Sequence, residues 1–355
     1  GASLDATVVG PGDGSLVLRA EDEGAGLLGG VFRDLAYRVF GDDGIGETIA
    51  DYVEDVGLPI DYIPATTRIS LDGATLTGTS VSVTASSTVP EQTLDIPFPL
   101  KVLVAKSLAS VDVTDSSIRA TGGDLTLSSR SSVTVNKHAE SLGLPVIDVA
   151  GAVTVVDSQA LATITGTSTL EAFGALNLTA DNTVESTTLA DGTAGGMTQA
   201  GGTVAVTVAV TDTLAALDGA VQIDAATDIN VTATSSNTIA TTVISTPGGA
   251  DGSGGMSTGP STGGGTGTGT GSGTATTNPM SLAGALAVAV VTNNTDAHIH
   301  ATDDTRVLKG SGTLNVATEM DNSITTKADA SSTNTPSATI GGGIAAPGNV
   351  IVADN

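Results

Sequence analysis

The chain has 355 residues and a formal net charge of −26, with four Phe, three Tyr, no Trp and no Cys. So few aromatic residues exclude a set of ordinary globular domains with large mixed cores, and the lack of Cys leaves repeated packing as the source of stability. The acidic surplus would repel phosphate backbones and anionic lipids, so neither nucleic acid nor a membrane surface is an expected partner. No apolar run is long enough to span a membrane.

The N-terminal part of the chain is expected to hold one β coil and then an insertion. In residues 1–23, Leu16-Val17-Leu18 follow a Gly-Asp-Gly turn, which is typical of a strand. Residues 24–63 hold five of the seven aromatic residues, and their apolar positions fall at helical spacing. We predict a small helical insertion there, either a bracket over one flank of the coils or a recognition surface.

Residues 64–355 are repetitive. The sequence from Gly151 onward aligns without a gap with the sequence from Val204 onward, at an offset of 53 residues. A third copy begins near Gly284. Within each copy apolar residues alternate with Thr, Ser, Asn or Asp, which predicts strands with one buried face. Each repeat of roughly 50 residues is expected to make two coils of short strands.

The predicted fold class is therefore all-β, a parallel β-helix (β-solenoid), because one repeat cannot close its own core and must stack on the next. An array of small β-sandwiches is the alternative, but such domains usually need an aromatic or disulfide-bonded core, and this sequence provides neither. The side chains expected in the core column are Ile164, Leu170, Leu176, Leu217, Ile223, Ile229, Ile299 and Leu314.

One segment interrupts the repeats. Residues 247–279 are almost wholly Gly, Ser and Thr, too poor in apolar groups to fold alone. They stand where the previous repeat has a shorter connection, so we expect a loop insertion and not a domain linker. Two Gly-x-Ser-x-Gly matches fall inside this segment, where chance matches are expected, so they predict no catalytic serine.

The strongest local constellation is Asp296, His298 and His300. In a strand these three side chains point to the same side and are the candidate ligands for a divalent metal, although no further convergent ligand is evident. No cofactor is expected beyond scattered, weakly held calcium, because neither an EF-hand loop nor a Gly-Gly-x-Gly-x-Asp repeat occurs.

Three Asn-x-Thr sequons begin at Asn177, Asn230 and Asn293. They match the acceptor pattern for N-glycans, but two of them recur only because the repeat recurs. We expect stacked rows of Asn and Thr instead. Thr-x-Thr pairs also occur, but the 53-residue alignment does not place them in register as an ice-binding face requires.

The recurring sequence at 152–158, 174–180 and 228–234 resembles the giant β-strand-repeat exoproteins of bacteria, which include filamentous-haemagglutinin-like and leukotoxin-like adhesins. The resemblance covers about residues 65–355. It implies secretion, a right-handed β-helix, and adhesion or cell-envelope scaffolding. Both ends of the chain stop in mid-pattern, so we expect a segment of a longer protein.

Two functions follow from this pattern. The first is a non-enzymatic, structural or adhesive segment of an extracellular bacterial surface fibre, whose partners are further β-solenoid of the same chain or other copies end to end, and cell-surface or matrix glycans. The second is a polysaccharide-binding or polysaccharide-active β-helix. A concave groove lined by at least three clustered charged residues and an aromatic would favour the second.

Overall fold

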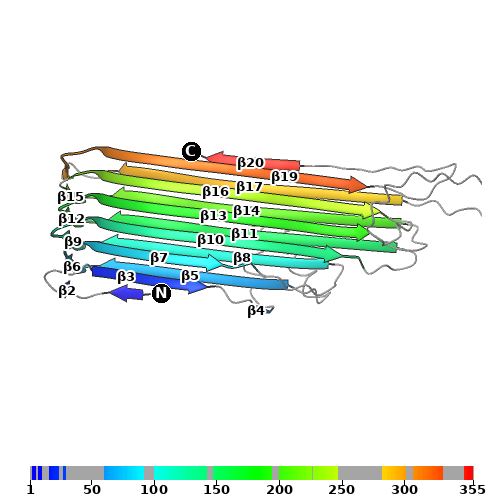
Figure 1. The fold of residues 1–355 in the computed structure, drawn as a ribbon, viewed down its shortest axis with the longest axis horizontal. Coiled ribbons are helices and arrows are strands. Elements are labelled where there is room, and N and C mark those ends of the chain that lie inside the picture. The colour runs from blue at the N-terminus through cyan, green and yellow to red at the C-terminus, as the bar shows by residue number, and fades with distance from the viewer. Residues whose placement is uncertain are drawn as a thin grey trace, which may run out of the picture.

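The computed structural model describes residues 2–4, 7–9, 16–23, 27–28, 60–91, 100–141, 147–193, 200–225, 227–246, 282–300, 307–330 and 348–354. These residues form three sheets that run through a stack of coils, two made of long strands and one of short strands (Figure 1). The chain is a parallel β-helix, as the sequence predicts.

The strands of each sheet lie side by side in chain order. Sheet A consists of β1 (Ala2–Leu4), β5 (Ile60–Asp72), β8 (Leu100–Thr114), β11 (Ile147–Thr165), β14 (Ala200–Asp218), β17 (Leu282–His300) and β20 (Gly348–Asp354), with β4 (Leu27–Leu28) antiparallel to β5. Sheet B consists of β2 (Thr7–Val9), β6 (Thr75–Gly78), β9 (Ser117–Ala120), β12 (Thr169–Ala172), β15 (Gln222–Ala225) and β18 (Val307–Lys309). Sheet C consists of β3 (Leu16–Glu23), β7 (Val81–Val89), β10 (Leu125–Glu140), β13 (Leu176–Thr193), β16 (Ile229–Thr246) and β19 (Leu314–Ala330).

One coil runs along a strand of sheet A, turns through a short strand of sheet B and returns along a strand of sheet C. The register of the sheets matches the sequence alignment, since Gly151 pairs with Val204 and Leu176 with Ile229. One repeat therefore makes one coil, and the prediction of two coils per repeat was wrong. The reason is strand length: β14 has 19 residues and β16 has 18, where about 5–6 is usual.

Most of the predicted core column is buried beside sheet B. Ile164, Leu170, Leu176, Leu217, Ile223 and Ile229 are each at most 4% exposed and belong to one apolar cluster. Ile299 packs partly buried against that cluster. Leu314 is 56% exposed, against expectation, because β19 is the last strand of sheet C in the described ranges and has a neighbour on one side only.

The turn from sheet A to sheet B repeats a left-handed backbone position in successive coils. It is occupied by Gly73, Asp115, Gly166 and Gly219, with φ between 48° and 89°. A Cβ on Gly219 would lie 3.0 Å from the carbonyl oxygen of Gly166, so glycine also permits the close stacking of these turns. Asp115 tolerates the conformation and uses its carboxylate, which accepts the Thr167 backbone N–H at 2.8 Å. That bond, with a second from the Thr167 hydroxyl, holds the pKa of Asp115 below its usual value of 3.8.

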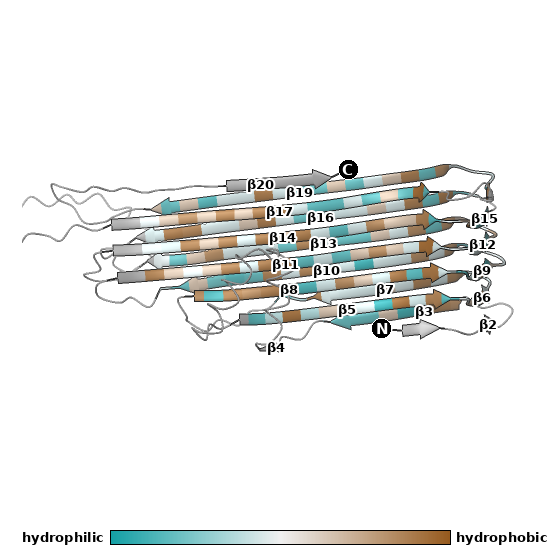
Figure 2. Cartoon of the chain, turned by 180° about the vertical axis from the view of Figure 1, so that it is seen from behind, coloured by the Kyte–Doolittle hydropathy of each residue, from teal (hydrophilic) through white to brown (hydrophobic). Residues whose placement is uncertain are grey.

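Sheets A and C face each other across an interior that is not uniformly apolar. Apolar and polar residues alternate along the long strands (Figure 2). One buried polar row crosses back and forth between the two sheets and consists of Thr154, Thr188, Thr207 and Thr241, all fully buried. Each hydroxyl after the first donates to the one before it, at 2.7 or 2.8 Å. The row satisfies hydroxyls that would otherwise be buried without a partner.

A second polar row lies nearer to sheet B. Ser131 donates to Ser107 at 2.7 Å and lies 2.8 Å from the Ser158 hydroxyl, which in turn donates to the Asn182 side-chain oxygen at 2.6 Å. The Ser107 hydroxyl continues the row by donating to Ser87 at 2.9 Å. Strands of sheets A and C alternate along this row, so it ties the two long sheets together coil by coil.

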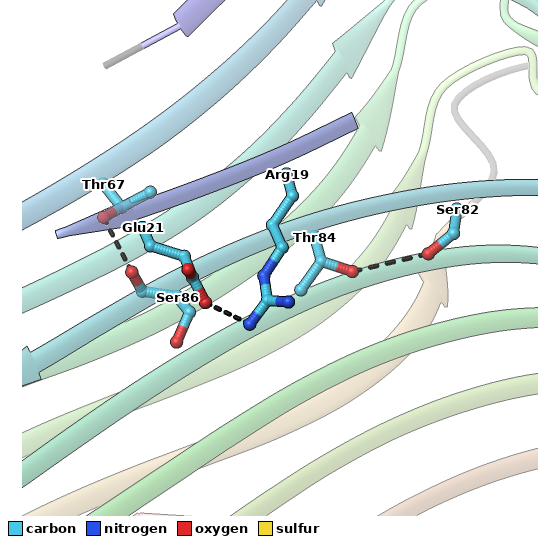
Figure 3. Close-up of polar contacts among 6 residues, drawn as sticks. All are labelled: Arg19, Glu21, Thr67, Ser82, Thr84 and Ser86. Carbon is cyan, nitrogen blue, oxygen red and sulfur yellow. Dashed lines mark hydrogen bonds and ion pairs between the residues drawn. The ribbon is translucent and has the colours of Figure 1, made fainter. Parts of the chain in front are cut away.

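Figure 3 shows a further interior contact, in which the Thr67 hydroxyl of β5 donates to the Ser86 carbonyl of β7 at 2.8 Å. The other contacts drawn there, Arg19–Glu21 and Ser82–Thr84, join residues two positions apart along strands of sheet C. Thr67 is 2% exposed, so its bond adds a link between the two long sheets from inside the coil.

Two predicted interruptions fall largely outside the described residues. Within 24–63, Leu27–Leu28 and residues 60–63 are strand and not helix, because they pair with each other in β4 and β5 or join sheet A. The rest of that predicted helical insertion lies outside the described ranges, as does 247–279. The strand ends that flank 247–279 keep the register of the previous coil, since Thr246 pairs with Thr193 and Leu282 with Ala200.

Replacing Ile223 with Asp should be strongly destabilising. Ile223 is 2% exposed in the core column, and an unpaired charge there would cost about 3–5 kcal/mol. Thermal unfolding followed by circular dichroism measures the effect. The adjacent and exposed Gln222→Asp is the matched control and should melt like the wild type. Equal melting of Ile223→Asp and the wild type would contradict the stacked core.

Replacing Thr207 with Val should test the threonine row. The shape is nearly kept, but the hydroxyls of Thr188 and Thr241 each lose a partner, so we expect a loss of about 1–3 kcal/mol. Chemical unfolding measures this free energy. Thr238→Val, on the exposed side of β16, is the control and should change stability little. A stabilised Thr207→Val variant would show that the row contributes nothing.

Candidate functional site

The predicted metal-site residues lie on the outer face of sheet A, at the end of β17. The Asp296 carboxylate is 2.7 Å from His298 Nδ1, so the structure brings these two together. A third group comes from the neighbouring coil, where Asp218 of β14 lies 3.3 Å from His298 Nε2. His300 is exposed and is the register partner of Asp218.

This arrangement does not form a metal cage. Both ring nitrogens of His298 face a carboxylate, so the imidazole separates Asp296 from Asp218 and does not converge with them on a common point. Within the described part of the chain, no three His, Cys, Asp or Glu side chains are placed to hold an ion. A carboxylate–imidazole–carboxylate bridge that links two coils describes the geometry better.

Acidic residues continue across the same face. Asp157 of β11 pairs with Lys106 of β8 at 3.3 Å. Asp212 of β14 is half-buried, and burial raises its pKa above the usual 3.8. The Asn294 amide, which donates to Asp212 at 3.2 Å, opposes that rise, while the charges of Asp157 and Asp296 add to it.

Two of the three sequons lie in a row, as expected. The Asn230 amide donates to the Asn177 side-chain oxygen at 2.9 Å on the outer face of sheet C. Asn293 differs, because it is 1% exposed and its amide donates inside the coil to Asn322 at 3.0 Å. An N-glycan cannot be attached to such a buried side chain without unfolding the coil.

A separate hollow lies over the short strands of sheet B and was not predicted. Its volume is about 310 Å³, and its lining includes Arg119, Glu171, Phe173 and Asp224. The three charged residues occupy one outward row, since Arg119 pairs in register with Glu171, and Glu171 with Asp224. Arg119 Nε lies 3.0 Å from the Glu171 carboxylate. Lys309 of β18 lies 3.9 Å from Asp224.

Phe173 is the unusual member of this hollow. It directly follows β12, and its backbone N–H donates to the Ala120 carbonyl at 3.0 Å. Thr121 holds the corresponding place after β9, where its N–H donates to Gly78 at 2.8 Å. Phe173 is 66% exposed, whereas large apolar side chains in this fold are mostly buried. The substitution of an aromatic residue for Thr at one repeat position was the signal available in the sequence.

The chain matches no protein-family model, no curated protein and no solved structure. Within the described ranges, no helix has the length and apolar character that a membrane crossing requires.

Replacing Asp212 with Asn should stabilise the protein at neutral pH. The raised pKa of Asp212 means that its charged form is held less well in the folded than in the unfolded chain, so removing the charge helps folding. The gain should shrink as the pH falls through the raised folded-state pKa and vanish below the ordinary value of 3.8. Melting temperatures across pH measure this. The exposed Asp321→Asn is the control, and a gain independent of pH would contradict the assignment.

Proposed function

We propose that this chain is a structural and adhesive segment of a long bacterial surface fibre that works outside the cell. The observation that carries the proposal is the unbroken register of three parallel sheets through successive coils. Such a stack buries its core only by adding coil on coil, so it suits an element that extends in one direction. The sequence resemblance to bacterial β-repeat exoproteins supports the same function.

The edge formed by β19 supports continuation of the stack. Leu314 and Val316 pair in register with the buried Ile229 and Val231 and so point toward the interior of the coil. They are nevertheless 56% and 42% exposed. A further coil, from the same chain or from another copy, would cover them and pair the open strand edge.

The long outer face of sheet C favours a solvated surface. Its outward positions are largely Thr, Ser, Asn and charged residues, such as Thr179, Thr183 and Glu185 on β13. With a net charge of −26, two such particles repel each other side by side, and this repulsion weakens as salt screens it. The proposal therefore places partners at the ends of the stack and ligands in local sites.

The proposal assigns no catalytic role. Several basic side chains on the described outer faces meet carboxylates, as Lys106 meets Asp157 at 3.3 Å and Arg130 meets Asp181 at 3.2 Å. A polysaccharide-binding β-helix is the second candidate, and the hollow around Phe173 favours it because three charged residues and an aromatic residue line one concavity. The two functions are compatible, because a structural fibre can also carry a saccharide-binding site.

Surface labelling of the cells that produce the protein tests the proposal. Antibodies raised against the folded chain should label intact cells, and electron microscopy should place the label on projecting fibres. An antibody against a cytosolic protein of the same cells is the control for leakage. Label that appears only after the cells are permeabilised would overturn the extracellular assignment.

A further inference from the structure

We propose that the hollow over β9, β12 and β15 is a binding site for a neutral saccharide of one or two rings. This inference deepens the adhesive role proposed above and rests on it. It is carried by the exposed aromatic ring, by the mixture of donors and acceptors around it, and by the size of the hollow.

Phe173 provides a flat apolar surface beside polar groups. The residue is 66% exposed, so most of its apolar area stays in contact with water. The C–H faces of pyranose rings pack against aromatic rings, and such contact recovers the apolar area that Phe173 leaves exposed. The turn holds the residue in place, because its N–H is bonded to Ala120 of the preceding coil.

The charged row supplies both donors and acceptors. Arg119 Nε lies 3.0 Å from the Glu171 carboxylate, and the two terminal nitrogens of the guanidinium can donate to ligand hydroxyls. Glu171 and Asp224 supply carboxylate oxygens that accept from ligand hydroxyls. A sugar hydroxyl both donates and accepts, so it fits a row that offers both kinds of group.

The charge balance favours a neutral ligand. The row runs Arg119, Glu171, Asp224 and Lys309 in register, and its two positive and two negative formal charges cancel. An anion that approached Arg119 would also meet two carboxylates, and a cation that approached them would meet Arg119 or Lys309. Uncharged hydroxyl groups meet neither penalty.

The size of the hollow sets the scale of the ligand. Its volume of about 310 Å³ lies at the lower limit of small-molecule sites, which span about 300–1,000 Å³. One or two sugar rings fit that volume. Arg119 and Asp224 are largely exposed and Glu171 is partly exposed, so a single site should bind its ligand weakly. A fibre that contains several copies of this chain would present several such sites, and its overall avidity would rise without any new contact.

Saturation-transfer difference NMR on the full chain tests the site. The probes are neutral disaccharides of glucose, galactose, mannose and N-acetylglucosamine, with a galacturonic acid dimer as the acidic comparison. We expect at least one neutral disaccharide to receive saturation and the acidic dimer to receive none. Phe173→Ala should weaken binding about tenfold, and Arg119→Gln should also weaken it because a donor is lost.

Two controls separate binding from folding. Phe173→Ala should keep the wild-type melting temperature, because the side chain lies outside the core. Val204→Ala removes an exposed apolar side chain from sheet A and should bind the sugar like the wild type. The inference is overturned if no neutral disaccharide binds, if only the acidic dimer binds, or if Phe173→Ala binds as the wild type does. Positive surface labelling with any of these results would leave the fibre proposal standing.

Discussion

Parallel backbone pairing at a fixed register is the constraint on which this structure depends. Each strand of sheets A and C presents alternate side chains inward, and a slip by one residue would turn all of them outward. The register places like on like: Thr154 pairs with Thr207, Thr188 with Thr241, and Asn177 with Asn230. The hydrogen-bonded rows, the left-handed corner and the charged row of sheet B are all products of this one alignment.

The same register explains the composition. Two long sheets that face each other leave an interior filled largely by small and β-branched side chains, with an apolar cluster that includes Val156, Ala209 and Val291 between the two polar rows. The hydroxyls of the two polar rows are tolerated in the interior because they bond to one another across the facing sheets. Lys137 of β10, only 7% exposed, is likewise matched by Asp61 of β5. Stability is thus distributed over many small contacts and not concentrated in aromatic residues.

Periodicity in the sequence was sufficient for the fold class and the register, because the offset that aligns Leu170 with Ile223 also pairs them in space. It was not sufficient for the number of coils, since alternation has the same period of two in a strand of 5 residues or of 19. The same limit applies to the sites. Asp296 and His298 lie two positions apart in one strand and were predicted together. Asp218 and the row of Arg119, Glu171 and Asp224 come from different coils, so only the register between coils brings them together.

The identity of repeat and coil has a consequence for how such a protein changes over generations. A duplication of one 53-residue unit would add one whole coil and lengthen the stack by about 4.8 Å. Every side chain would keep its inward or outward orientation. Unequal crossing-over between repeats in the gene would then change the number of coils by whole coils. Additions of other sizes are absorbed where a coil ends, as between Thr246 and Leu282, whose paired neighbours are the ends of a much shorter connection. The number of coils and the length of the connections between strands can therefore evolve separately.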